Sequence, residues 1–367
     1  MKKAISLVLS VLLMCNFAFA EISVTSENVT DFDTEKLTLF KELIQDLYYK
    51  DISDKELYDA AIRGMFNALD VYSAYYNQEQ TEVFEETTSG NYVGIGIKFE
   101  GNAEFMRVVN VFTGTPADAA GVMVGDYIVE VNGQEVYGMS TTKVASMIKG
   151  EEGTNVKIGL LRGDIFFVLD IERQKVQAES CSFNVLEKDI GYIKIEEFND
   201  STYTEVSKYV QALKALGMNK LILDLRDNSG GYVSQAVAVA NHFVPKGVVT
   251  TLRYKNSAKD KEYVSVLKDP FFKLVVLVNE NTASSAEILA GAIKDTKAGT
   301  LIGMKTYGKG VFQNMYNLKD GGSIKITTGV YHTPNGTSID RVGIMPNILV
   351  EGADAQLTRA IEEVKKI

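Results

Sequence analysis

Ser284 occupies a position in the sequence that suits a catalytic nucleophile. The preceding run Leu274–Val278 is apolar throughout, and helical spacing extends from Ser284 to Lys294. Backbone N–H groups and the positive end of the helix dipole are concentrated at a helix N-terminus. A serine hydroxyl there can attack a carbonyl carbon, because those groups stabilise the oxyanion that develops. Taken alone, however, a serine at such a position is more often a helix cap.

Two adjacent glycines follow a second apolar run. Leu221–Leu225 has the character of a buried strand, and Gly230 and Gly231 come shortly after it. Paired glycines let backbone amides approach a ligand closely. We therefore expect Gly230 or Gly231 to supply one backbone N–H of an oxyanion hole and Ser285 to supply the other. On this segment alone, a plain strand-to-helix turn is the competing interpretation.

Lys309 is the candidate general base. It stands between Gly308 and Gly310, directly before an apolar run. A desolvated lysine binds its proton less tightly and can act as a base near neutral pH. A Ser–Lys pair needs no histidine, which suits a chain with only His242 and His332, both of which we expect to be structural. Taken alone, a lysine in a surface turn is the alternative.

Composition limits the classes of function. The chain has 367 residues, of which 46% are hydrophobic, with a formal net charge of −10. That length allows about two or three domains. An acidic chain without a basic run is a poor nucleic-acid binder. Cys15 and Cys181 are the two cysteines, which excludes a zinc–thiolate cluster, so we expect no metal and no cofactor.

The first 20 residues resemble a cleaved secretory leader. Lys2 and Lys3 precede an apolar stretch that ends in Ala18-Phe19-Ala20. These are the features of a signal peptide, whereas the apolar run is short for a membrane anchor. No other stretch approaches a transmembrane length, so we expect no integral membrane segment. The chain is predicted to be secreted across the cytoplasmic membrane, to the periplasm or the cell exterior.

Residue patterns divide the rest of the chain into three parts. Helical spacing over 34–70, followed by a polar and irregular stretch over 71–90, predicts an N-terminal helical region at 21–90. Short β-rich runs, a hairpin turn at Asn132-Gly133 and one helix predict a β-rich domain at 91–175. Alternating strands and helices predict an α/β core at 176–367 that ends in a C-terminal helix.

Four ordered segments resemble the carboxyl-terminal processing proteases, also called tail-specific proteases. The matching segments are Asp224-Leu225-Arg226-x-Asn228-x-Gly230-Gly231, Thr282-Ala283-Ser284 with Glu287–Ala292, Gly308-Lys309-Gly310 with Gln313, and Tyr331–Ile344. The resemblance covers about Leu37 to Val350. It implies that Ser284 is the nucleophile, that Lys309 is the general base and that Gln313 orients the lysine.

The chain departs from the family pattern at two places. The family usually has Ser-Ala-Ser where this chain has Ser284-Ser285-Ala286. The family often has Asp-Pro-His-Ser where this chain has Asp70-Val71-Tyr72-Ser73. From the second departure we expect no catalytic cost, only altered packing or assembly of the helical region.

Residues 92–175 resemble the PDZ domain that these proteases carry. By that resemblance, the loop Gly94-Ile95-Gly96 receives the terminal carboxylate of a peptide that adds a strand to the domain edge. An apolar pocket is expected beside it, lined by Val93, Ile95, Ile97, Val144 and Ile148. Lys149 falls where relatives often place an arginine that senses bound substrate, so we count it among the peptide-binding residues.

Together these features imply a multidomain α+β protein with an N-terminal helical region, a PDZ domain and an α/β protease core of crotonase/Clp-like type. The predicted function is a secreted serine endopeptidase of the carboxyl-terminal processing type, acting on protein or peptide substrates with a free C-terminus. The alternative is a catalytically inactive PDZ scaffold, and a crotonase-like acyl-handling enzyme is a third candidate. The helical region is a candidate surface for a homodimer, and an activating partner is left open.

Overall fold

The computed structural model describes residues 7–9, 22–24, 31–101, 105–187 and 189–367, and these form two compact units. The first unit contains the described residues up to Phe84 together with 250–263 and 308–343. The second unit contains 85–249, 264–307 and 344–367. Of the predicted leader at 1–20, the structure describes Leu7–Leu9 (β1), and the rest lies outside the described residues. Strand β1 pairs with Ile22–Val24 (β2). None of the helices in the described ranges is long and apolar enough to cross a membrane.

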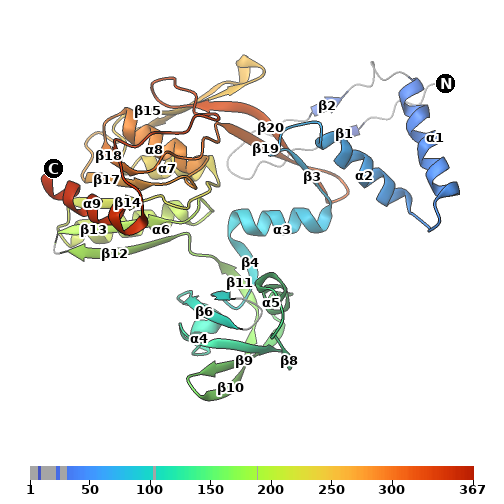
Figure 1. The fold of residues 1–367 in the computed structure, drawn as a ribbon, viewed down its shortest axis with the longest axis horizontal. Coiled ribbons are helices and arrows are strands. Elements are labelled where there is room, and N and C mark those ends of the chain that lie inside the picture. The colour runs from blue at the N-terminus through green and yellow to red at the C-terminus, as the bar shows by residue number, and fades with distance from the viewer. Residues whose placement is uncertain (1–6, 10–21, 25–30, 102–104, 188) are drawn as a thin grey trace. The chain divides into compact units, whose positions relative to one another are not determined.

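Two helices open the first unit, within the region where helical spacing predicts them. They are α1 (Asp31–Leu47) and α2 (Asp54–Phe66) (Figure 1). Ser53 caps α2, because its hydroxyl accepts the Glu56 N–H at 3.2 Å and the Glu56 carboxylate accepts the Ser53 N–H at 2.8 Å. Lys41 and Gln45 of α1 both bind the Asp54 carboxylate, at 3.1 and 2.8 Å, and so tie the two helices together.

A largely antiparallel sheet forms the rest of the first unit. Its order is β16-β15-β20-β19, and β3 also pairs with β20. The members are β3 (Ala74–Tyr76), β15 (Gly247–Tyr254), β16 (Lys261–Ser265), β19 (Val311–Asn317) and β20 (Ser323–His332), with a short 3₁₀ turn at Ser257–Lys259. The pairing of β19 with β20 shifts register between Phe312 and Gln313, because Thr328 of β20 is an extra residue between their partners Gly329 and Thr327.

The prediction that residues 71–90 are irregular is wrong, because this stretch contains helix α3 (Gln78–Ser89). Its residues are mostly polar and lack an apolar stripe. The helix start carries a capping box. The side-chain oxygen of Asn77 accepts the Gln80 N–H at 2.9 Å, and the side-chain oxygen of Gln80 accepts the Asn77 N–H at 3.2 Å. A buried contact of 2.8 Å between the hydroxyls of Thr81 and Ser323 then fixes the helix to β20.

The β-rich part of the second unit is a sheet of order β10-β9-β7-β6-β5, with β8 on β7 and a separate β4–β11 pair. The strands are β4 (Asn91–Gly94), β5 (Ile97–Gly101), β6 (Met106–Val111), β7 (Tyr127–Val131), β8 (Gln134–Glu135), β9 (Asn155–Arg162), β10 (Ile165–Glu172) and β11 (Gln174–Gln177), and the helices are α4 (Pro116–Ala119) and α5 (Thr141–Ile148). Positive φ angles at Asn132 and Gly133, 52° and 78°, confirm the predicted hairpin turn. Strand β5 has an open edge beside α5.

The α/β part of the second unit has a sheet of order β12-β13-β14-β17-β18-β21, parallel from β13 onward. Its elements are β12 (Cys181–Glu187), β13 (Ile190–Ile195), β14 (Lys220–Asp224), β17 (Lys273–Val278), β18 (Gly299–Gly303), β21 (Ile348–Leu349), α6 (Thr202–Ala215), α7 (Val233–Ala240), α8 (Ser285–Asp295) and α9 (Ala353–Lys366). Helix α9 packs on one face against Ile222, Val275 and Leu277 (Figure 1). The alternate residues Leu221 and Val276 are equally buried, so the sheet is covered on both faces.

Strands β14 and β17 are parallel neighbours, and this pairing positions the candidate catalytic segments. Asp224 lies opposite Leu277, so both strands end at the same edge of the sheet. The Gly-Gly turn follows β14 and the Ser284 turn follows β17. Two segments that are about 50 residues apart in sequence therefore meet at one sheet edge.

Candidate active site

Ser284 directly precedes α8 in an unusual backbone conformation. Its φ and ψ angles are 56° and −120°. An ordinary helix-capping serine has an extended backbone, and a positive φ is rare for residues other than glycine. Such strain persists only where the surroundings enforce it, and it is frequent at active sites. Ser284 forms a capping box with Glu287, but its backbone conformation differs from that of a common capping serine.

Glu287 holds the Ser284 turn. Its carboxylate is fully buried and accepts the Ser284 N–H at 2.9 Å and the Thr306 hydroxyl at 2.5 Å. The Thr306 hydroxyl in turn accepts the Ile344 N–H at 2.7 Å. One buried carboxylate thus joins the turn before α8 to the start of the segment that leads to Lys309. Glu287 carries no predicted role in the sequence, although the spacing Ser284-x-x-Glu287 is the pattern of a capping box.

Asn228 fastens the Gly-Gly turn to the Ser284 turn. Its buried side chain donates to the Ile195 carbonyl at 2.9 Å and accepts the Gly230 N–H at 2.8 Å. Its backbone carbonyl accepts the Ala283 N–H at 2.9 Å. The side chain and the backbone of one residue, Asn228, therefore link the ends of β13, β14 and β17.

Only glycine fits at positions 230 and 231. A Cβ atom on Gly230 would lie 2.7 Å from the Ser284 Cβ, and the φ angle there is 107°. A Cβ atom on Gly231, where φ is 131°, would lie 2.2 Å from the Phe198 carbonyl oxygen. The structure thus brings together Ser284, Ser285, Gly230 and Gly231 as the sequence predicts them to meet. The close approach explains why both positions need glycine.

The predicted oxyanion donors differ in their hydrogen bonds. The Gly230 N–H donates to Asn228, as described above. No hydrogen bond between described residues uses the N–H of Gly231 or Ser285, and Gly231 is exposed. The Gly231 amide is therefore available to a ligand, whereas the Ser285 amide is buried and the Gly230 amide is engaged.

The hydroxyls of the two adjacent serines are in different environments. Ser285 is fully buried, and its hydroxyl donates to the Gly231 carbonyl at 2.8 Å. Ser284 is partly exposed. The Ser285 hydroxyl thus stabilises the Gly-Gly turn, and Ser284 is the one that a substrate can reach.

Asp224 and Arg226, which belong to the first matching segment, connect the sheet to its last helix. Asp224 is buried and accepts from Arg226 at 2.6 Å and from the Tyr192 hydroxyl at 2.7 Å. Burial and the Asp224 charge together raise the pKa of Tyr192. The Arg226 guanidinium also donates to the Ala353 carbonyl of α9 at 2.8 Å. This pair therefore ties the end of β14 to the start of α9.

Lys309 and Gln313 lie in the first unit, whereas Ser284 and the Gly-Gly turn lie in the second. The Lys309 Nζ is 4.8 Å from the centroid of the Tyr72 ring, and the Tyr331 hydroxyl donates to the Lys309 carbonyl. The Gln313 side chain donates to the Thr327 hydroxyl at 3.1 Å. Tyr307, two positions before Lys309, belongs to the second unit, where its N–H donates to the Thr282 carbonyl at 3.0 Å.

His242 has a structural environment. Its Nε2 lies 2.8 Å from the Ser207 hydroxyl and its ring stacks on Tyr203, with 5.4 Å between centroids. Burial lowers the pKa of His242. Within the described ranges, no three His, Cys, Asp or Glu side chains lie together as metal ligands.

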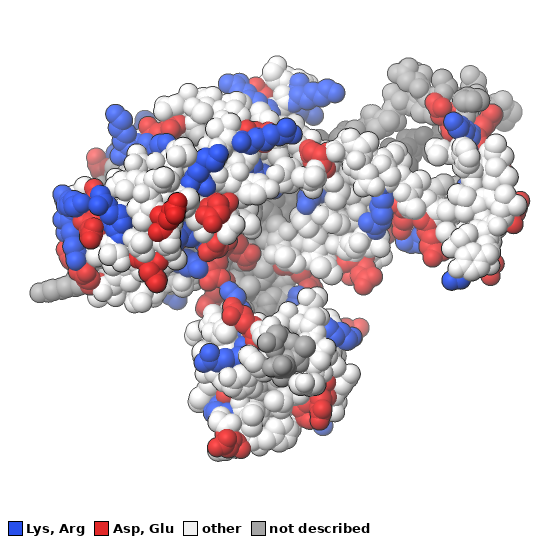
Figure 2. Space-filling view, in the orientation of Figure 1, with Lys and Arg blue, Asp and Glu red and all other residues white. Residues whose placement is uncertain are grey.

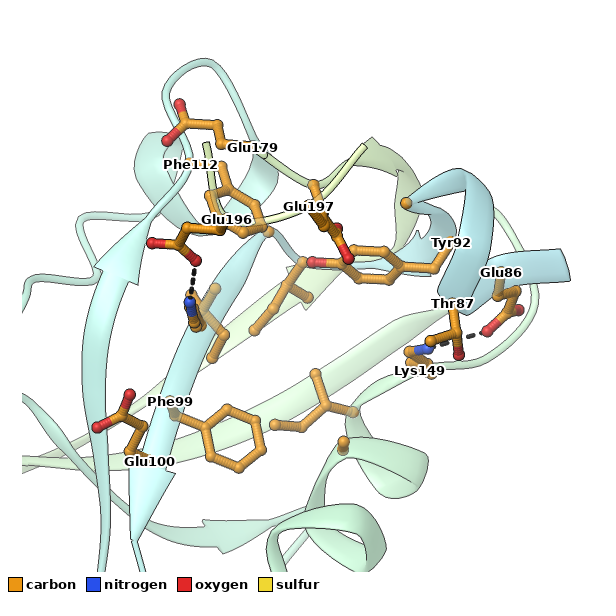
Figure 3. A pocket seen from close by; sticks show the side chains of 18 of the residues that line it. Glu86, Thr87, Tyr92, Phe99, Glu100, Phe112, Lys149, Glu179, Glu196 and Glu197 are labelled. Carbon is orange, nitrogen blue, oxygen red and sulfur yellow. Dashed lines mark hydrogen bonds and ion pairs between the residues drawn. The ribbon is translucent and has the colours of Figure 1, made fainter. Parts of the chain in front are cut away.

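A pocket of about 680 Å³ lies in the second unit beside the open edge of β5. Its apolar lining includes Ile95, Ile97, Phe99 and Ile148, while Phe112 and several glutamates stand around it (Figure 3). Val93 and Val144, which the sequence predicts to line the pocket, do not line it. Val93 lies in β4, which pairs with β11 rather than with β5, and Val144 is fully buried in the core of the β-rich domain.

The loop Gly94-Ile95-Gly96 connects β4 to β5, and Ile95 and Gly96 line this pocket. Gly96 has a φ angle of 87°, and a Cβ there would lie 2.3 Å from the Thr115 Cβ. The Ile95 and Gly96 carbonyls accept N–H groups of Ala117 and Phe112 at 2.8 and 2.9 Å. No hydrogen bond between described residues uses the N–H of Ile95 or Gly96. Both amides are therefore available to an acceptor.

Lys149 ends α5 at the rim of the pocket. Its Nζ lies 2.9 Å from the Glu86 carboxylate and 4.9 Å from the centroid of the Tyr92 ring (Figure 3). The Lys149 and Glu86 side chains are 40% and 39% exposed, so this ion pair contributes little stability. Across the pocket, burial and the nearby Glu196 charge raise the pKa of Glu197.

Comparison with known proteins agrees with this geometry. Residues 189–350 match the model of peptidase family S41, residues 107–162 match a PDZ domain and residues 18–80 match the N-terminal domain of the activating protease CtpB. The chain is 35% identical over 332 residues to the carboxy-terminal processing protease CtpA of Bacillus subtilis, covering 90% of this chain and 71% of that protein. It is 34% identical to a CtpA-like serine protease of Staphylococcus aureus (strain COL), covering 98% and 73%.

A solved structure agrees as well. The photosystem II D1 C-terminal processing protease is 29% identical, with a TM-score of 0.51 and coverage of 85% of this chain and 86% of that chain. An S41 protease from Bacteroides fragilis, 18% identical with a TM-score of 0.52, shares the fold. The chain therefore belongs to the carboxy-terminal processing serine proteases of peptidase family S41 and combines a PDZ domain with the mixed α/β protease domain.

Proposed function

We propose that the chain is an endopeptidase in which Ser284 is the nucleophile, Lys309 is the general base and Gln313 orients Lys309. The observation that carries this proposal is the strained Ser284 turn, packed against a Gly-Gly turn at the start of α8. The chain connection supports the partner, because Lys309 follows Tyr307 by two positions and the Tyr307 N–H is bound to Thr282. Ser284 is partly exposed whereas Ser285 is fully buried, which favours Ser284 as the nucleophile.

In the proposed reaction, the Ser284 oxygen bonds to the scissile carbonyl carbon and its proton passes to the Lys309 Nζ. The N–H groups of Gly231 and Ser285 stabilise the oxyanion, and the Gly230 N–H could join them only by leaving Asn228. The C–N bond then breaks as Lys309 returns the proton to the leaving amine. Water hydrolyses the resulting ester with Lys309 again acting as base, which restores Ser284.

The inactive PDZ scaffold is the less favoured function. A scaffold needs no strained serine and no buried carboxylate to hold it, and strain costs about 1–3 kcal/mol. Incubation of the chain with an unfolded protein, beside its Ser284→Ala variant, distinguishes the two. Cleavage by the unaltered chain alone supports the enzyme, and no cleavage by either supports the scaffold.

We extend the proposal to the fold and the location of the protein. The parallel strands β13, β14, β17 and β18, covered on both faces, support a crotonase/Clp-like core. The PDZ domain match at 107–162 falls inside the proposed domain at 91–175, between a helical region at 21–90 and a core at 176–367. The residues of the leader support secretion to the periplasm or the cell exterior.

The pocket beside β5 is proposed to bind the substrate's C-terminal tail. An extended tail can pair with the open edge of β5, while its carboxylate accepts the N–H groups of Ile95 and Gly96. Ile97 and Ile148 line the pocket and favour a small or apolar last residue over Asp or Lys.

We expect amidation of a peptide C-terminus to weaken binding by about 1–3 kcal/mol, because it removes the charge and one acceptor oxygen. The measurement is the Kd of the Ser284→Ala variant for free and amidated forms of one apolar-ended peptide. Adding Ile148→Lys should weaken the binding of both peptides, because an ammonium in the pocket disfavours an apolar last residue, whereas Val168→Lys, exposed on the far edge strand β10, should leave both affinities unchanged. Equal affinity of both peptides for the Ser284→Ala variant would remove tail recognition.

The first two helices are proposed to form a homodimer surface. In the described part of α2 no residue is buried, and α1 exposes large apolar side chains, among them Leu37 (63%) and Leu47 (79%). Figure 2 shows uncharged surface over much of the face that these helices present. Exposed apolar patches of this kind mark interaction sites.

We expect the chain to elute as a dimer and Leu37→Glu with Leu47→Glu to convert it to a monomer, because burying two carboxylates in an apolar interface is costly. Light scattering coupled to size exclusion gives the mass. The matched control is Ile165→Glu, on an exposed apolar position of β10. A monomeric unaltered chain would contradict the proposal.

A further inference from the structure

The Tyr72 ring and the Lys309 ammonium are in contact within the first unit. The Lys309 Nζ lies 4.8 Å from the centroid of the ring, and both side chains are partly buried. A cation within about 6 Å of a ring centroid is attracted to the electron-rich face of the ring. This attraction exists only while the lysine is protonated. The contact can therefore act on the protonation state as well as on the position of the side chain.

The segment that carries Tyr72 is held firmly. The Asp70 carboxylate accepts the N–H groups of Tyr72 and Ser73, both at 2.9 Å. The Ser73 hydroxyl accepts the Thr327 N–H at 3.0 Å, which fixes the segment to β20. Because the backbone of Tyr72 is anchored, the ring has little freedom to leave Lys309.

The same segment also reaches Gln313. The Thr327 hydroxyl donates to the Asp70 carboxylate and accepts the Gln313 amide at 3.1 Å. Asp70 thus supports the Tyr72 ring through the backbone and Gln313 through Thr327. The two side chains proposed to assist the reaction around Lys309 share one anchor.

We infer that Tyr72 is a positioning residue for Lys309: its ring holds the ammonium in place and stabilises the protonated lysine that forms when Ser284 loses its proton. This inference rests on the proposed role of Lys309 as general base. It also differs from the expectation drawn from the sequence, in which the departure at Tyr72 has no catalytic cost.

Other charged or titratable groups face this part of the chain and must be kept constant in a test. They are Asp70; Tyr331, whose hydroxyl donates to the Lys309 carbonyl; Asp340, whose carboxylate accepts the Gly310 N–H at 3.3 Å; and Arg341, 3.9 Å from Asp340. Burial opposes ionisation of Asp70, but hydrogen bonds from Thr327, Tyr72 and Ser73 hold its pKa below the ordinary value. Asp70 therefore stays charged at neutral and alkaline pH, and none of these groups is changed by a substitution at Tyr72.

The test compares Tyr72→Leu with Tyr72→Phe in the full chain. Leucine keeps an apolar group beside the lysine but removes the ring face, whereas phenylalanine keeps the ring and removes only the hydroxyl. The measurement is kcat/KM for one unstructured peptide as a function of pH.

In Tyr72→Leu we expect the acidic limb of the profile to move to lower pH by about 0.5–1.5 units, because the protonated lysine loses stabilisation. The plateau at high pH should fall by about 2- to 30-fold, because the same stabilisation is lost in the transition state. Tyr72→Phe should retain the limb and the plateau. A merely structural role of the ring would lower the plateau without moving the limb.

Three outcomes would overturn the inference. If the acidic limb of Tyr72→Leu does not move while Lys309→Ala is inactive, the ring has no such role and the proposed function stands. Equal shifts in Tyr72→Leu and Tyr72→Phe assign the effect to the hydroxyl. Full activity of Lys309→Ala removes the proposed function itself. If Tyr72→Leu fails to fold, Tyr72→Met replaces it with the same expected shift.

Discussion

Replacing Ser284 with alanine should reduce the hydrolysis of an unfolded protein by at least about a thousandfold, and Lys309→Ala should cause a similar loss. Each change removes one end of the same proton transfer. The double variant should therefore be no worse than either single variant, because the two residues act as a unit. The folds should remain, since both side chains are partly exposed and neither contributes to a buried core. Initial rates with one labelled substrate and circular dichroism of each variant provide the measurement.

Ser285→Ala is the matched control for the nucleophile. It removes the hydrogen bond to the Gly231 carbonyl but no reacting atom. We expect a reduced rate that is still well above that of Ser284→Ala. Inactivity of Ser285→Ala together with activity of Ser284→Ala would exchange the roles of the two serines. Additive losses in the double variant would contradict a shared proton transfer.

The second large effect is expected at Glu287. In Glu287→Ala the Ser284 N–H and the Thr306 hydroxyl both lose their buried acceptor. An unsatisfied buried donor costs about 1–3 kcal/mol, so the free energy of unfolding should fall by about 3 kcal/mol. The Ser284 turn should also relax toward an ordinary helix cap, so activity should fall to near background even where the protein is folded.

The Glu287→Gln variant distinguishes an effect on the conformation of the Ser284 turn from an effect of unfolding. Glutamine has nearly the same volume but only one acceptor oxygen, so one of the two donors stays unsatisfied. We expect a smaller loss of stability than for alanine and an intermediate rate. Glu351→Gln, at an exposed carboxylate of the same unit, should change neither the denaturation midpoint nor the rate. If Glu287→Ala retains both stability and activity, the carboxylate does not hold the Ser284 turn.

Local patterns predict much of the fold. The apolar runs Leu221–Leu225 and Leu274–Val278 fall on β14 and β17 to within one residue, and α8 begins one residue after the predicted start. Burial of one or both faces of a strand requires a recognisable pattern of apolar residues in the sequence. Helix α3 lacks such an apolar pattern, because its packing depends on a polar contact with a strand more than two hundred residues away.

The predicted site shows the same limit. The residue types and spacing indicate Ser284 and the Gly-Gly turn, because a tight turn at a helix start has a local signature. The hydrogen bond from the Gly230 N–H to the Asn228 side chain has no such signature, since both groups lie in one loop where each has several possible partners. The contact of Tyr72 with Lys309 joins positions 237 residues apart, and only the sheet built from β3, β19 and β20 brings them together.

The most direct test of the central claim is to label the nucleophile with an apolar peptidyl fluorophosphonate and locate the adduct by peptide mass mapping. The reagent phosphonylates an activated serine hydroxyl: the serine oxygen bonds to phosphorus and fluoride leaves. We predict one adduct per chain, on Ser284, formed in parallel with the loss of proteolytic activity and strongly slowed in Lys309→Ala. An adduct on Ser285, or labelling of Ser284 at the same rate with and without the Lys309 amine, would contradict the account.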